Sequence, residues 1–89
     1  MPQIRFTSWL REVVPDAAID ADGATVGDAL ASVFANLPHV RGYVLDDRGT
    51  LRKHVCVFAD GRRLPRGETL SHPIRHDSQL YVMQALSGG

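Results

Sequence analysis

The sequence has one cysteine, no long apolar run and no net charge, and each shortage excludes a class of protein. A single thiol, Cys56, can build neither an internal disulfide framework nor a structural zinc site, which suits a reducing cytoplasm. Residues 1–5 are not a basic segment leading into an apolar one, so no signal peptide is expected. No apolar run approaches the ~20 residues that span a bilayer, and we expect no membrane partner.

Ten acidic residues balance ten basic ones, so the chain has no net charge. This argues against nucleic acid as the main partner, because proteins that bind nucleic acid usually carry an excess of positive charge. The charges are unevenly placed: residues 1–47 hold seven acids and three bases, and residues 48–89 hold seven bases and three acids. This asymmetry fits a surface that orients a protein partner, and it fits a merely solvated surface equally well. Glycine-rich phosphate-binding motifs are also missing, so we expect the chain to bind no nucleotide itself.

What the chain has is the composition of one small globular domain. It contains 89 residues, of which 44% are apolar and 22% charged. A core of that size can stabilise a fold with little margin, so it is not expected to house elaborate catalytic machinery.

Hydrophobic patterning predicts one helix. Thr25 is a typical N-cap residue, and Asp28 follows three residues later, where a negative charge favours a helix start. Pro38 is expected to end the helix. Between these limits one apolar stripe recurs at helical spacing, made of Val26, Leu30, Val33, Phe34 and Leu37.

The rest of the chain predicts strands. Alternation predicts a first strand over residues 4–7 and a thinner second one over 17–21, and residues 39–50 are expected to be a connection with a turn at 46–49. Strands follow at 51–59, 62–64 and 79–83, the first two joined by the hairpin pair Asp60-Gly61. The order β-β-α-β-β-β predicts an α+β fold, a mixed sheet of four to five strands with one helix on one face.

Strand alternation also predicts which side chains the helix leaves uncovered. If the valines at 55, 57 and 82 and Leu80 face the helix, the intervening residues point the other way. Large apolar side chains on an uncovered face suggest a protein-binding patch, unless a loop covers them. The residues concerned are His54, Cys56, Phe58, Tyr81 and Met83.

In this arrangement the sequence resembles the MoaD/ThiS family of ubiquitin-like sulfur carriers, in the longer branch that includes carriers for cysteine biosynthesis. The resemblance covers essentially the whole chain in the right order. Its parts are Leu10-Arg11 after the first strand, the helix start at 25–30, the strand and turn at 51–61, the segment 76–82 and the terminal Ser87-Gly88-Gly89. Cys56 and Gln84-Ala85 depart from the residues common in that branch, which leaves the pathway open.

The resemblance implies a β-grasp fold over residues 1–83 and a flexible tail over 84–89. It implies that the Gly89 carboxylate is adenylated and then converted to a thiocarboxylate, with Ser87 and Gly88 threading the terminus into the partner's active site. Phe58, Tyr81, Met83 and Leu86 would bind the partner. The chain would be a carrier rather than an enzyme, with no bound cofactor and with ATP used by the partner.

The partners that the resemblance implies are all proteins. They are a MoeB/ThiF-like adenylyltransferase, a sulfur donor such as a persulfide enzyme, a sulfur-accepting biosynthetic enzyme and a JAB-type metallopeptidase. Two other functions use the same terminus and stay open. One is a protein modifier conjugated through Gly89 to lysines, and the other is the small subunit of molybdopterin synthase.

Three further patterns favour ordinary structure over chemistry. His72 and His76 have a helical metal-binding spacing, but Pro73 separates them in a loop-like stretch, and no metal site is expected. Cys56 with His54 lacks an evident oxyanion site for nucleophilic catalysis. The basic cluster Arg62, Arg63 and Arg66 is expected to be a solvated loop.

Overall fold

The computed structural model describes residues 1–7, 10, 12–14 and 17–84. Its strands are β1 (Gln3–Phe6), β2 (Ile19–Asp20), β3 (Val55–Ala59), β4 (Arg62–Arg63) and β5 (Gln79–Gln84). Its helices are α1 (Val26–Asn36) and α2 (Arg41–Val44), with 3₁₀ turns η2 (Pro38–Val40) and η3 (Arg66–Glu68). No helix in this part of the chain combines the length and apolar character needed to cross a membrane.

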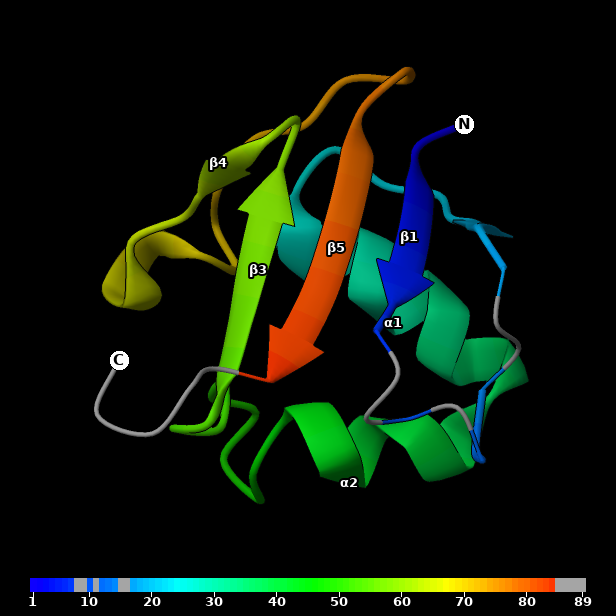
Figure 1. Cartoon of the computed structure of the whole chain (residues 1–89), viewed down its shortest axis with the longest axis vertical. Coiled ribbons are helices and arrows are strands. Elements are labelled where there is room, and N and C mark those ends of the chain that lie inside the picture. Colours follow the sequence, from blue (N-terminus) through cyan, green and yellow to red (C-terminus); the bar gives the residue numbers. More distant parts are fainter. Residues whose placement is uncertain (8–9, 11, 15–16, 85–89) are drawn as a thin grey trace.

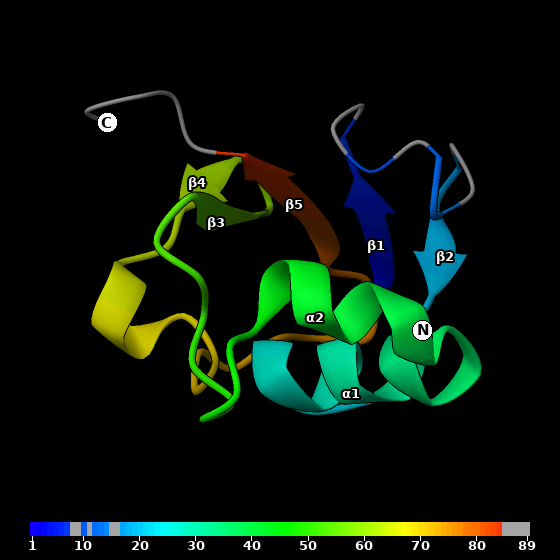
Figure 2. The same ribbon diagram turned by 90° about the horizontal axis from the view of Figure 1, so that it is seen from below.

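The five strands form one mixed sheet in the order β2-β1-β5-β3-β4. β1 and β5 pair in parallel, and the other neighbours pair antiparallel. Figure 1 looks onto one face of the sheet with α1 behind it, and Figure 2 shows both helices on the same side. The opposite face, here called the open face, is covered by no helix of the described residues. This is the predicted β-grasp fold, and the predicted order of the five strands and of the helix between the second and third strands is confirmed.

α1 begins where its sequence predicted. The Thr25 hydroxyl accepts a hydrogen bond from the Asp28 N–H at 3.1 Å, which satisfies one of the free amides of the first turn. Four residues of the predicted apolar stripe, Val26, Leu30, Val33 and Phe34, are buried in the core that α1 forms with the sheet. The fifth, Leu37, is the C-cap of α1 and is partly buried against the same core. From the sheet, this core takes Ile4, Phe6, Val55, Val57, Leu80 and Val82.

The expectation of a plain connection over residues 39–50 was wrong. Pro38 does end α1, but it then occupies the first position of η2, where its missing N–H costs nothing. The chain continues directly into α2, and Val40 and Val44, four residues apart, are fully buried. α2 lies across the end of the sheet at which β1 and β5 terminate (Figures 1 and 2). The described part of the chain therefore forms two α-helices where one was predicted.

The predicted turns have the expected chemistry. Asp60 and Gly61 both have positive φ, 51° and 86°, as a two-residue hairpin between twisted strands requires. The loop after α2 closes on Asp46, whose Oδ1 accepts from the N–H groups of Thr50 and Arg48. The Thr50 N–H is the main cause that lowers the pKa of the Asp46 carboxyl below its ordinary value.

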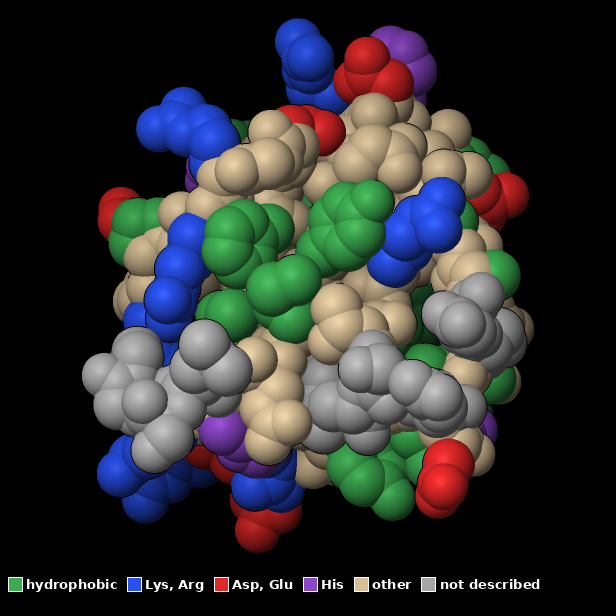
Figure 3. Space-filling view, in the orientation of Figure 1, with side chains coloured by type: hydrophobic (Ala, Val, Ile, Leu, Met, Phe, Trp, Pro, Cys, Tyr) green, Lys and Arg blue, Asp and Glu red, His purple; other side chains and the backbone are tan. Residues whose placement is uncertain are grey.

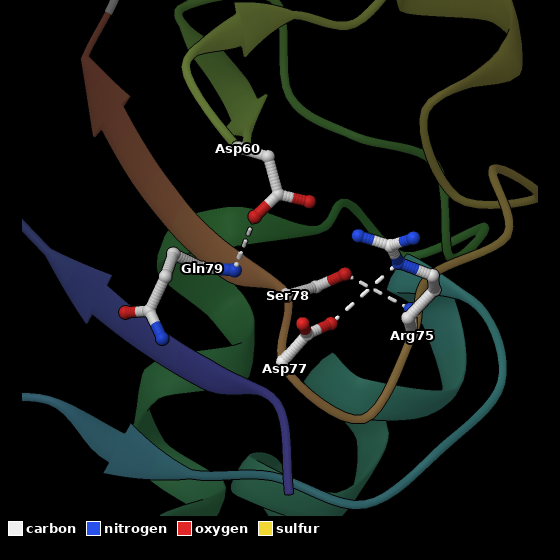
Figure 4. A network of polar contacts seen from close by, with 5 residues as sticks. All are labelled: Asp60, Arg75, Asp77, Ser78 and Gln79. Atoms are coloured by element: carbon white, nitrogen blue, oxygen red, sulfur yellow. Dashed lines mark hydrogen bonds and ion pairs between the residues drawn. The ribbon is translucent and has the colours of Figure 1, made fainter.

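A small polar network fixes the start of β5 (Figure 4). Asp60 Oδ1 accepts from the Gln79 N–H at 2.8 Å, which ties the hairpin turn to β5. The buried Ser78 hydroxyl accepts from the Arg75 N–H at 2.9 Å. Because both contacts involve backbone groups, they set the register at which β5 enters the sheet.

Candidate functional site

The open face carries the predicted patch of large side chains. Phe58 lies directly opposite Tyr81 on the neighbouring strand, and Cys56 lies opposite Met83. Tyr81 is 38% exposed, and Phe58 and Met83 are half-buried. Figure 3 shows hydrophobic side chains gathered over β3 and β5 on this face. The structure thus brings Phe58, Tyr81 and Met83 together, as strand alternation predicted, and we call these three residues the apolar patch.

The inner side of the same strands explains why the patch points outward. Val55, Val57, Leu80 and Val82 are between 0% and 1% exposed. Since successive side chains in a strand alternate between faces, burying these four on α1 turns their neighbours to the open face. Two strands with a fully buried inner side therefore hold the patch rigidly in place.

His54 does not belong to this face. It was expected there with Cys56, but β3 begins at Val55 and His54 lies exposed in the turn before it. Cys56 is a buried free thiol, 7% exposed. No group of three or more His, Cys, Asp or Glu side chains within residues 1–7, 10, 12–14 and 17–84 is placed to hold a metal ion.

Arg66 is exposed, as expected for a solvated segment, but its guanidinium is also a structural clamp that the sequence did not predict. Its Nη1 donates to the carbonyls of Leu51 and Arg52, at 3.2 and 2.9 Å. Its Nη2 donates to the carbonyls of Lys53 and, at 2.8 Å, Val55. One planar guanidinium thus collects four backbone acceptors that precede or begin β3, and fixes the strand that carries Phe58.

Replacing Arg66 by Met should therefore loosen this segment. Met keeps the apolar stem but has no donor, so we expect the free energy of unfolding to fall by about 1–2 kcal/mol. Arg62→Met is the matched control, since Arg62 is an exposed neighbour on β4 and should change stability by less than ~0.5 kcal/mol. Urea denaturation measures both, and equal losses in the two variants would contradict the clamp.

The predicted working end of the chain, Leu86, Ser87, Gly88 and Gly89, lies outside the described residues. What the structure does show is where the tail starts. β5 continues through Gln84, one residue beyond the predicted strand end, and Gln84 pairs with Val55. β5 thus ends one residue after Met83 of the apolar patch.

Comparisons with known proteins find similarity to the ThiS family and to small archaeal modifier proteins. The model of the ThiS family matches residues 4–89. The small archaeal modifier protein 3 of Haloferax volcanii is 30% identical over an alignment 90 residues long, and the alignment covers 98% of this chain and 97% of the relative. The crystal structure of SAMP1 from Haloferax volcanii has a TM-score of 0.76 at 28% identity, covering 99% of this chain and 98% of the other.

A third similarity concerns the fold alone. A chain in the crystal structure of the BexX/CysO complex from Amycolatopsis orientalis has a TM-score of 0.85 at 17% identity. The match covers 100% of both chains. The same fold thus occurs over the full length of a chain whose sequence is largely different.

Proposed function

This chain belongs to the ThiS family of ubiquitin-like small modifiers and sulfur carriers, and we propose that it is a sulfur carrier working through the carboxylate of Gly89. The observation that carries the proposal is the junction of patch and tail. The apolar patch ends at Met83, and the sequence that follows β5 ends in Ser87-Gly88-Gly89. A partner that binds the open face at Met83 is therefore close to the point where the chain continues from β5 towards the Gly89 carboxylate.

The length of the tail limits where the partner's chemistry takes place. An extended chain advances by up to ~3.3–3.6 Å per residue, so the six residues from Gln84 to Gly89 reach roughly 20 Å. Gly88 and Gly89 have no side chains, which lets the terminus enter a narrow channel and adopt backbone angles closed to other residues. The partner's reactive site should accordingly lie within about 20 Å of the surface that covers Met83.

The reaction needs activation because a carboxylate is a poor electrophile. Attack of the Gly89 carboxylate on the α-phosphorus of ATP would form an acyl-adenylate and release pyrophosphate. The terminal sulfur of a persulfide would then displace AMP to give an acyl disulfide. A thiol would attack the donor's sulfur in that bond, forming a disulfide with the donor and releasing the thiocarboxylate. In this scheme the chain contributes the carboxylate and the docking face, and a MoeB/ThiF-like adenylyltransferase contributes the catalysis.

A second candidate function is protein modification through the same activated terminus. The relative at 30% identity is named a small archaeal modifier protein, which favours this candidate. The two functions differ in the acceptor, sulfur in one case and a lysine amine in the other. Intact mass under reducing conditions separates them. Replacement of one oxygen by sulfur marks the carrier, and ladders of this chain on target proteins mark the modifier.

The apolar patch gives a prediction for docking. Met83→Asp and Phe58→Asp should each weaken binding to the adenylyltransferase by ~2 kcal/mol or more, because a charge would replace a desolvated apolar contact. Calorimetry measures the binding, and thermal melting checks that the half-buried positions tolerate the change. Tyr43→Asp is the control, since Tyr43 is 46% exposed on α2, away from the open face. If both patch variants bind normally, the apolar patch does not contribute to docking, and binding must depend on the tail and on charge.

A further inference from the structure

Four side chains from four neighbouring strands form a single row across the open face. Arg5 on β1 is opposite Tyr81 on β5, Tyr81 is opposite Phe58 on β3, and Phe58 is opposite Arg63 on β4. The row therefore reads cation, aromatic, aromatic, cation. Figure 3 shows this pattern as basic side chains on both sides of the hydrophobic cluster.

Burial of the neighbouring residues confirms that both arginines point to this face. Ile4 and Phe6, on either side of Arg5, are buried in the core, so Arg5 between them is directed outward. Leu64, which follows Arg63, is buried in the same core. Arg5 and Arg63 are both exposed.

The two positive charges are not neutralised by the described part of the chain. Neither Arg5 nor Arg63 forms an ion pair there, where the observed ion pair joins Arg75 to Asp77 at 3.5 Å. At the other end of the face, the carboxylates of Asp20 and Asp60 are hydrogen-bonded to groups other than these two arginines. Asp20 accepts from Gln3 Nε2 at 3.2 Å, and Asp60 accepts from the N–H that begins β5.

The spacing of the row is fixed by the sheet. Adjacent strands lie about 4.8 Å apart, so the backbones of Arg5 and Arg63, three strand intervals from one another, are about 14 Å apart. Both arginines belong to hydrogen-bonded strands of one sheet, so the positions of their backbones on either side of the apolar centre are set before any partner arrives. A pre-set pair of like charges around an apolar centre selects partners by geometry as well as by sign.

We propose that this row selects, for the open face, a protein surface with an apolar centre and carboxylates on two opposite sides of it. The inference rests on the proposed function, in which that surface belongs to the adenylyltransferase. Phe58 and Tyr81 supply the apolar contact, and Arg5 and Arg63 steer the approach and fix its orientation. The tail then meets the partner in one orientation only.

The test is the double variant Arg5→Glu/Arg63→Glu in the full-length chain, with Arg62→Glu as the matched control. Arg62 is the same residue type on the same strand, but it pairs with Ala59, whose side chain is buried on the helix side. Stopped-flow binding to the purified MoeB/ThiF-like adenylyltransferase of the same organism is measured at about 50 and about 300 mM salt. We expect the double variant to lower the low-salt association rate constant at least ~10-fold and to flatten its salt dependence, and the control to change it less than ~2-fold.

Several results would overturn the inference. The arginines do not steer docking if the double variant associates no more slowly than Arg62→Glu, or if it keeps the wild-type salt dependence. The proposed function survives this result if Met83→Asp still weakens binding. Wild-type chain that supports no ATP–pyrophosphate exchange overturns the proposed function, and this inference with it. A melting curve is measured for each variant. If the charge reversal unfolds the domain, Arg5→Gln/Arg63→Gln replaces it, and its effect on the association rate constant is expected to be intermediate.

Discussion

Deleting Gly88 and Gly89 should abolish adenylation of this chain and leave the melting temperature of its domain unchanged. The deletion moves the terminal carboxylate to Ser87 and shortens the reach of the tail by about 7 Å, so the carboxylate no longer reaches ATP in the partner. The fold should survive because its buried core extends from Ile4 to Val82, well before the deleted pair. ATP–pyrophosphate exchange with the adenylyltransferase measures the first effect, and thermal melting measures the second.

Ser87→Ala serves as the control for the deletion. Ser87 is itself expected to thread the terminus, but this variant removes only the hydroxyl and keeps the length, both glycines and the terminal carboxylate, so exchange should fall far less than after the deletion. If ATP–pyrophosphate exchange persists at the wild-type rate after the deletion, the proposed sulfur-carrier function is wrong, because no other carboxylate is proposed for activation. It would equally remove the modifier alternative, which needs the same acyl-adenylate.

Replacing Phe34 by Ala should lower the free energy of unfolding by about 3–5 kcal/mol, a large share of the total for so small a domain. Phe34 is 7% exposed and belongs to the core cluster that joins α1 to the sheet. Its removal takes away apolar contact and leaves a space that the neighbouring side chains fill only in part. Urea denaturation followed by circular dichroism measures the change.

Phe34→Leu provides the comparison, since it retains most of the apolar volume and should cost less than half as much as the alanine variant. Both variants should keep the open face, which lies on the other side of the sheet, and so should still bind the adenylyltransferase under conditions where they are folded. A loss below about 1 kcal/mol for Phe34→Ala would mean that α1 does not bury this ring against the sheet.

Features that depend on near neighbours in sequence could be predicted from the sequence. The Thr25 cap needs a hydroxyl three residues before a free amide, and the hairpin needs two residues that tolerate positive φ, here Asp60 and Gly61. Strand alternation placed Phe58, Tyr81 and Met83 on the open face for the same reason, because side chains along a strand alternate with a period of two.

Predictions failed where contacts distant in sequence set the structure. α2 is a single helical turn with Gly42 inside it, too short for a hydrophobic period, and it forms because Val40 and Val44 have a core to enter. The four acceptors of the Arg66 guanidinium lie 11 to 15 residues earlier in the chain, and no local pattern marks them. His54 falls outside β3 since the clamped segment turns there before the strand begins.

The sequence by itself determined the family resemblance, the β-grasp order of elements and the terminal Ser87-Gly88-Gly89, because motifs and element order are properties of a linear chain. Only the tertiary structure decided what surrounds the apolar patch. Arg5 lies in the acidic half of the chain and Arg63 in the basic half, so counting charge by halves separates the two residues that the sheet places in one row. The parallel pairing of β1 with β5 creates that row, and such a pairing joins residues more than seventy positions apart. The physical reason is that strand register is fixed by burial of the inner face, to which every strand contributes at once.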